Sequence, residues 1–189
     1  MVSGRTWWLI GGGALAWLLY SQRQGITGAV ESGVDAVTAA VAGWKSVKDG
    51  PIWVPVLNAA EAQYGIPPDL LARMAYQESH FRPEIIDGTV TSSAGALGIM
   101  QLMPQYFGTV NRPRPFTGQD TGAQIQEAAA ELARLYDHFG DWALAVAGYN
   151  DGQGNVDKYR AGTRALPDET YSYVSEVLAD VPVATGALV

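Results

Sequence analysis

The sequence predicts a mainly α-helical protein. Apolar residues recur at intervals of three and four along several stretches, most clearly over residues 123–139. We find no convincing alternation of apolar and polar residues of the kind that marks a half-buried strand, and no internal repeat. The length of 189 residues suits one domain with an appendage, and 48% hydrophobic residues are enough for a core.

Residues 1–24 are expected to direct the chain to a membrane. Residues 7–20 carry no charge, and extending the segment to residues 4–21 brings it close to the length of a bilayer span. Tryptophan and tyrosine at its two ends suit the membrane interfaces. We favour an uncleaved anchor with a cytoplasmic N-terminus. A secretory signal peptide and a hydrophobic helix buried in a larger assembly are the alternatives.

Residues 25–50 are expected to form an amphipathic helical connector. Val30, Val34, Val37, Val41 and Trp44 follow one another in steps of four and three, like a short heptad seam. The connector is predicted to pack on its own domain or on the membrane surface. The alternative is contact with a second copy or with proteins of a virion or envelope machine.

A helical domain is expected over residues 51–189. Its first helix is predicted over residues 52–64 and ends at Gly65. The next begins at Asp69, whose charge suits a first turn, and ends before Pro83. A polar loop over 89–98 follows. The later helices are predicted over 99–107 with a break at Pro104, 123–139 with a stop at Gly140, 142–149, 156–159 and 169–178, with a loop over 151–154.

Glu78 is the candidate catalytic residue. It lies four residues after Met74, on the apolar face of the predicted helix, and in the last turn, where the helix dipole disfavours negative charge. Burial and the dipole both raise the pKa of a carboxyl group, which suits a general acid near neutral pH. The alternative is an ordinary surface or salt-bridged glutamate.

Three ordered motifs distinguish these interpretations. The first is Glu78-Ser79, Phe81 and Pro83 followed by SAGALGIMQLMP at 93–104; the second covers 143–152; the third comprises Pro167, Glu169-Thr170 and Tyr173-Val174. Together they resemble the family 1 lytic transglycosylases, which implies a lysozyme-like (goose-type or SLT) fold and cleavage of peptidoglycan. The chain departs from that pattern in a long loop over 84–92, in Gly148 and in Asp151.

The resemblance implies that Glu78 is both acid and base. It protonates the bond between N-acetylmuramic acid and N-acetylglucosamine, then closes a 1,6-anhydro ring without metal or cofactor. Glu169 is expected to support the site. The expected substrate-binding residues are Ser79, Gly95, Gly98, Met100, Gln101, Tyr149, Asn150 and Tyr173, with core packing as the alternative for Met100 and a turn-stabilising role for Asn150.

The composition argues against two further classes of protein, those that bind nucleic acid and those held together by disulfides. A net charge of −7 argues against binding nucleic acid, and the chain has no cysteine for disulfides. His80 and His138 lack metal-ligand spacing and are expected at the surface, at helix ends. The candidates for a second carboxylate are Asp87, Asp151 and Glu169.

The sequence therefore predicts an envelope-located lytic transglycosylase, for phage DNA entry or for a secretion or conjugation machine. The alternatives are a goose-type lysozyme-like hydrolase and a non-catalytic glycan-binding structural protein.

Overall fold

The computed structural model describes residues 53–179, 181, 183 and 188. The predictions for residues 1–24 and 25–50 lie outside them. The described part contains no strand, only an isolated bridge between Leu97 and Leu102, so the mainly α prediction is confirmed. The elements in order are α3 (Val54–Tyr64), α4 (Leu70–Ser79), α5 (Pro83–Ile86), the 3-10 helix η1 (Gly108–Val110), α6 (Gly118–Phe139), α7 (Trp142–Asp151), α8 (Gln153–Arg160) and α9 (Asp168–Leu178).

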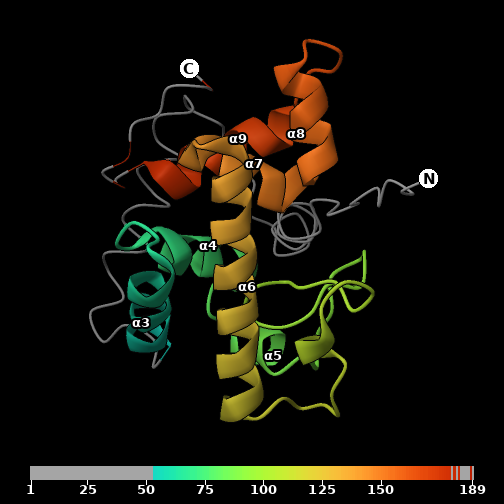
Figure 1. Cartoon of the computed structure of the whole chain (residues 1–189). Coiled ribbons are helices and arrows are strands. Elements are labelled where there is room, and N and C mark those ends of the chain that lie inside the picture. Colours follow the sequence, from blue (N-terminus) through green and yellow to red (C-terminus); the bar gives the residue numbers. More distant parts are fainter. Residues whose placement is uncertain (1–52, 180, 182, 184–187, 189) are drawn as a thin grey trace, which may run out of the picture.

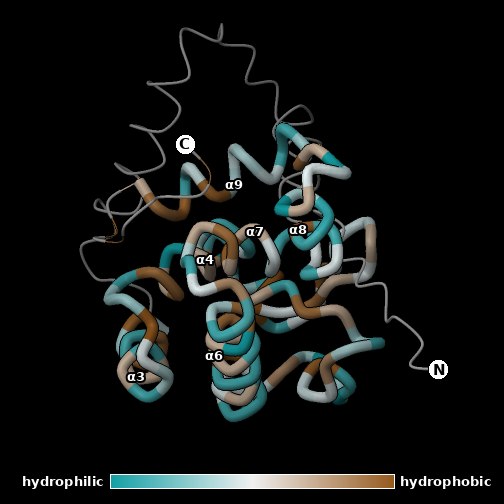
Figure 2. The backbone as a smooth tube through the Cα atoms, turned by 45° about the horizontal axis from the view of Figure 1, so that its top comes forward, coloured by the Kyte–Doolittle hydropathy of each residue, from teal (hydrophilic) through white to brown (hydrophobic). Residues whose placement is uncertain are grey.

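Helix α6, with 22 residues, runs through the middle of the domain (Figure 1). It packs against α3, α7 and η1. Hydrophobic and hydrophilic residues alternate along it with helical spacing (Figure 2), and Ile125, Ala128, Leu132 and Leu135 of its apolar face are buried. None of the described helices combines the length and the apolar composition that a bilayer crossing requires.

Helix α6 begins earlier than the periodicity predicted. Thr117 accepts a hydrogen bond from the backbone of Asp120, whose carboxylate accepts one from the backbone of Thr117 in return. This capping box satisfies N–H groups that the first turn would otherwise leave unpaired, so the polar residues 118–122 are helical. The predicted stop at Gly140 is confirmed.

Helix α7 is the buried centre of the fold. Every residue from Ala143 to Asn150 is buried, and Tyr136 of α6 stacks on Trp142 at the start of α7, with ring centroids 4.0 Å apart. A Cβ atom at Gly148 would lie 2.9 Å from the ring of Phe139 on α6. This close helix packing explains why the chain has glycine at that position.

Three local predictions were wrong. Residues 99–107 form turns instead of a helix, because Gly98 and Gln101 have positive φ angles (+77° and +47°) that reverse the chain there. The predicted loop over 151–154 reduces to Gly152, since α7 ends at Asp151 and α8 begins at Gln153. The polar stretch after Arg82 contains α5, which the sequence pattern did not reveal.

Helix α4, which carries Glu78, is held at its start by a residue of another helix. Glu61 of α3 is 3% exposed, and its carboxylate accepts hydrogen bonds from the backbone N–H groups of Asp69 (2.9 Å) and Ala72 (3.0 Å). The side chain of Asp69 makes no capping hydrogen bond. The side chain that caps this N-terminus therefore comes from α3, which fixes α4 relative to α3.

Candidate active site

The end of α4 determines where Glu78 lies. Helix α4 stops at Ser79 because His80 and Phe81 both have left-handed backbone conformations (φ of +49° and +52°). The Ser79 hydroxyl donates to the carbonyl of Ala75 and accepts from the N–H of Phe81, and its side chain is fully buried. We infer that Ser79 shapes this turn; this geometry does not support the predicted sugar contact.

Glu78 is hydrogen-bonded to a tyrosine of the last helix. The hydroxyl of Tyr173 on α9 donates a hydrogen bond of 2.7 Å to Glu78 Oε1. Burial raises the pKa of Glu78 to about 7, and the hydrogen bond from Tyr173 opposes that rise. Burial and the charge of Glu78 raise the pKa of Tyr173 well above its usual value, so Tyr173 remains a donor. A half-buried carboxyl group with this pKa holds its proton in part at neutral pH, as a general acid requires.

Replacing Tyr173 by phenylalanine is expected to move the pH profile upward. Loss of the hydrogen bond to the carboxylate form leaves burial unopposed, so the pKa of Glu78 rises further. If Glu78 acts as a general acid, the fall of kcat/KM with increasing pH should occur at a higher pH than in the wild type. Kinetics over pH 5–9 would measure this. Tyr171→Phe, on the exposed side of the same helix, is the control; an unchanged profile for Tyr173→Phe would contradict the assignment.

Tyr149 of α7 completes the centre of the site. Its hydroxyl donates to the backbone carbonyl of Met100 (2.9 Å), which connects α7 to the turn over residues 97–102. Burial and then the charge of Glu78 raise the pKa of Tyr149, so the two groups lie in one electrostatic environment. The side chain of Met100 is fully buried in the main core. This burial fits the alternative of core packing for Met100, and the carbonyl is the group through which Met100 is bonded to Tyr149.

The turn over residues 97–102 holds the other predicted binding residues. Gly98 has a positive φ of +77°, and its carbonyl accepts hydrogen bonds from the backbone N–H (3.2 Å) and side-chain Nε2 (2.9 Å) of Gln101. Gln101 is only 8% exposed, so its amide points back onto its own turn. Gly95 lies before the turn, with a φ of +86° and no atom within 4 Å of a Cβ position. There the chain leaves room for an approaching ligand.

Asn150 and Glu169 join α7 to α9 beside this centre. Asn150 Oδ1 accepts a hydrogen bond of 2.9 Å from the buried hydroxyl of Thr170. Burial, and then the charge of Asp151, raise the pKa of Glu169, and its Oε1 is buried with no partner among the described residues. Both positions fit support of the site more directly than sugar contact.

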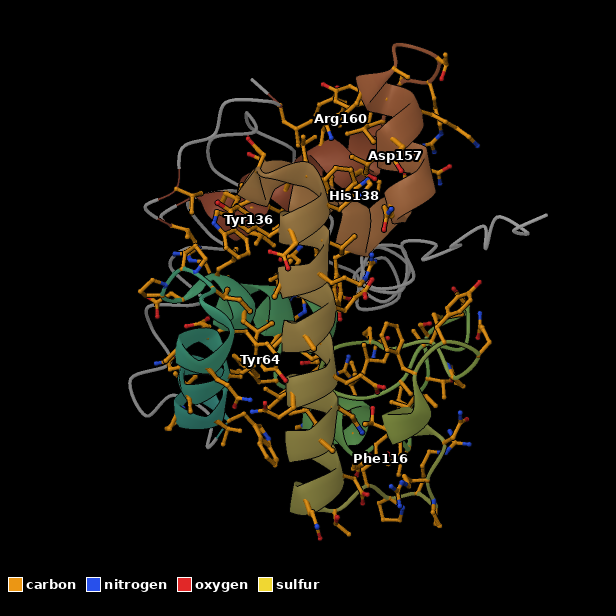
Figure 3. All side chains as sticks on the ribbon, viewed as in Figure 1. Tyr64, Phe116, Tyr136, His138, Asp157 and Arg160 are labelled. Carbon is orange, nitrogen blue, oxygen red and sulfur yellow. The ribbon has the colours of Figure 1, made fainter. Side chains whose placement is uncertain are left out.

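The other titratable residues lie elsewhere. Asp151, which departs from the family pattern, forms an ion pair with Arg164. His138 is exposed and bonds Asp157 of α8 at 2.8 Å (Figure 3), as expected for a surface histidine. His80 caps the C-terminal end of α4, as predicted, and is partly exposed beside Tyr76, where burial lowers its pKa. Among the residues described, no three His, Cys, Asp or Glu side chains are arranged to hold a metal ion.

Sequence reasoning missed two residues that shape the site. Glu61, the cap of α4, had no local signal, because its partners lie 8 and 11 residues further on in another helix. Gln124 is fully buried on α6 and lies against Gly98. The sequence did contain a signal for Gln124, because this residue lies on the same helical face as the buried Thr121, Ile125 and Ala128.

Comparison with known proteins gives the same assignment. Residues 55–172 match the transglycosylase SLT domain family. The transglycosylase of Enterobacteria phage PRD1 is 31% identical over 136 residues, 71% of this chain and 48% of that protein. Membrane-bound lytic murein transglycosylase D of Escherichia coli K12 is 34% identical over 117 residues, 54% of this chain and 25% of that protein.

A solved structure shares the fold. The structure of an inactive glutamate-to-glutamine mutant of lytic transglycosylase Slt from Pseudomonas aeruginosa superposes with a TM-score of 0.52 at 30% identity, covering 66% of this chain and 22% of that one. The chain thus spans less than half the length of each of these proteins. Its motifs, helical fold and family match agree, and the chain belongs to the transglycosylase SLT domain family.

Proposed function

We propose that this protein is a peptidoglycan lytic transglycosylase with Glu78 as its single acid and base. The observation that carries the proposal is the Glu78 carboxyl group, held by Tyr173 and with its pKa raised to about 7. The family match and the names of the relatives, which are transglycosylases of a phage and of bacterial membranes, support the same substrate class.

The proposed reaction has two steps. Protonated Glu78 transfers its proton to the oxygen O4 that links C1 of N-acetylmuramic acid to C4 of N-acetylglucosamine, and the C1–O4 bond breaks. The resulting carboxylate then takes the proton of the muramic C6 hydroxyl while O6 attacks C1. A 1,6-anhydro end forms, Glu78 is protonated again, and no water is consumed.

The candidates for a second carboxylate bear on a two-carboxylate mechanism, and the products bear on the choice between a lytic transglycosylase and a goose-type hydrolase. A hydrolase usually needs a second carboxylate to activate water or attack the sugar. Asp87 accepts hydrogen bonds from the N–H (2.8 Å) and hydroxyl (2.7 Å) of Thr89, and Asp151 is paired with Arg164. Burial, and then the charge of Asp151, raise the pKa of Glu169, whose Oε1 is buried. Ring closure by the substrate itself needs none of them.

The chemical form of the released muropeptides distinguishes a lytic transglycosylase from a hydrolase. Full-length protein in detergent is incubated with purified peptidoglycan, and the released muropeptides are analysed by mass spectrometry. We expect 1,6-anhydro ends, which are 18 mass units lighter than reducing ends because no water is added. Reducing ends would instead establish a goose-type hydrolase. Binding to peptidoglycan without any product would leave the structural, non-catalytic alternative.

We also propose that the enzyme acts at a membrane, for local opening of the cell wall. The uncharged residues 7–20 support a membrane anchor, and the phage and membrane-bound relatives suggest a virion or an envelope machine as the setting. Flotation with lipid vesicles checks the anchor: the full chain should rise with the vesicles, and a chain lacking residues 1–24 should not. Equal flotation of both chains would contradict it.

A further inference from the structure

Gln124 is a buried polar residue that the proposed reaction does not use. Its side chain is 0% exposed, and neither Oε1 nor Nε2 has a hydrogen-bond partner among the residues that the structure describes. Leaving a buried amide unpaired is unfavourable, and such groups are rare in folded proteins. An apolar side chain of similar size would fill the same space without that cost, so the amide calls for an explanation.

The amide of Gln124 lies directly against Gly98. A Cβ atom at Gly98 would be 2.0 Å from Gln124 Oε1, 2.8 Å from Cδ and 3.2 Å from Nε2. Only glycine permits this approach, because any side chain there would overlap the amide. The buried amide of α6 is therefore in contact with the backbone of the turn that carries Gln101.

Gln101 occupies the carbonyl of Gly98, the residue that Gln124 lies against. The Gly98 carbonyl accepts from the backbone N–H and from the side-chain Nε2 of Gln101, so both of its lone pairs are used. Gln101 itself has a left-handed backbone (φ of +47°), an uncommon conformation for a residue other than glycine. Two glutamine amides thus lie at Gly98: that of Gln101 is bonded to its carbonyl, and that of Gln124 lies against the residue without a hydrogen-bond partner among the described residues.

We propose that Gln124 is a positioning residue for glycan binding: its amide takes the place of the Gln101 amide at the Gly98 carbonyl, which lets Gln101 turn outward to the sugar. The last torsion of a glutamine side chain is soft, so Nε2 of Gln124 can turn toward that carbonyl without leaving its site. This inference rests on the proposed function and on the contact between Gln101 and the glycan that the sequence resemblance implies.

The exchange of the two glutamine amides at the Gly98 carbonyl changes which of them is left without a hydrogen bond. With Gln101 turned inward, the Gln124 amide is unpaired; with Gln101 turned outward, Gln124 is bonded and Gln101 is available to the ligand. Gln124 therefore favours the binding-competent arrangement, and removing its amide lowers the population of that arrangement. The same removal eliminates an unpaired buried group from the free protein, which does not destabilise the fold. Binding and stability should thus change in opposite directions.

Methionine at position 124 tests this separation, since it keeps the length and bulk of the side chain without the amide. In the Glu78→Gln background, which prevents turnover, the full-length chain is titrated with a tetrasaccharide of alternating N-acetylglucosamine and N-acetylmuramic acid. We expect Gln124→Met to weaken binding roughly three- to tenfold, with an equal or higher Tm. Gln119→Met, at an exposed position of α6, is the matched control and should leave both values unchanged.

A double-mutant cycle identifies the path of the effect. If Gln124 acts through Gln101, Gln124→Met should have no further effect on binding in a Gln101→Ala background. An equal loss of binding in both backgrounds, unchanged binding, or a Tm that falls together with the affinity would each overturn the inference. The proposed function is tested separately, by the release of 1,6-anhydro products from the chain with Glu78 intact. If that chain releases these products while Gln124→Met leaves glycan binding unchanged, only the role of Gln124 is refuted.

Discussion

Replacing Glu78 by glutamine is expected to lower the rate of peptidoglycan cleavage roughly a thousandfold or more. Glutamine has nearly the same shape and still accepts the hydrogen bond from Tyr173, but it has no proton to give to the glycosidic oxygen. Because one group serves as both acid and base in the proposed reaction, its loss affects both steps. Release of soluble muropeptides over time measures the rate. Glu84→Gln, at a partly exposed residue paired with Arg82, is the control and should retain activity.

The same substitution should not damage the fold. The folded state raises the pKa of Glu78 from 4.5 to about 7, so it binds the proton more tightly than the unfolded state. The stability that this proton contributes is fully present below pH 4.5 and is lost as the pH rises through 7. Glu78→Gln should therefore gain Tm relative to the wild type as the pH increases from 5 to 8. If the Glu78→Gln variant cleaved peptidoglycan at the wild-type rate, Glu78 would not be the catalytic acid.

Replacing Glu61 by alanine is expected to destabilise the domain by about 3 kcal/mol. The buried carboxylate accepts hydrogen bonds from two N–H groups at the start of α4, and alanine would leave both without an acceptor and open a buried void. Denaturant unfolding measures the loss of free energy. Activity should fall with stability, because α4 carries Glu78.

Two further substitutions separate the hydrogen bonds of Glu61 from its bulk. Glu61→Gln keeps one acceptor oxygen and nearly the full volume, so its cost should lie between those of the wild type and Glu61→Ala. Glu84→Ala removes a carboxylate from a surface ion pair and should cost less than about 1 kcal/mol. Equal destabilisation by Glu61→Ala and Glu84→Ala would refute the capping role.

The predictions that held are those that depend on neighbouring residues. The apolar spacing predicted α6, α7 and α9, and Gly65 and Gly140 ended helices where expected, because helix formation and capping act over a few residues. The prediction failed over residues 99–107, where the stripe of Ile99, Met100 and Leu102 is buried by a turn instead of a helix. Periodicity reports which residues are buried there, but positive φ angles at Gly98 and Gln101 determine the backbone.

The sequence by itself determined the helical class, the position of Glu78 on an apolar helix face near its end, and the three motifs that indicated the family. Only the tertiary structure determined that Glu61 caps α4, that the carbonyl of Met100 accepts a hydrogen bond from Tyr149, and that Tyr173, 95 residues from Glu78, donates one to its carboxyl group. The physical reason is the separation along the chain over which each effect acts. Capping and periodicity arise within a few residues, whereas the pKa of a carboxyl group depends on burial and on partners that only the packing of distant helices brings together.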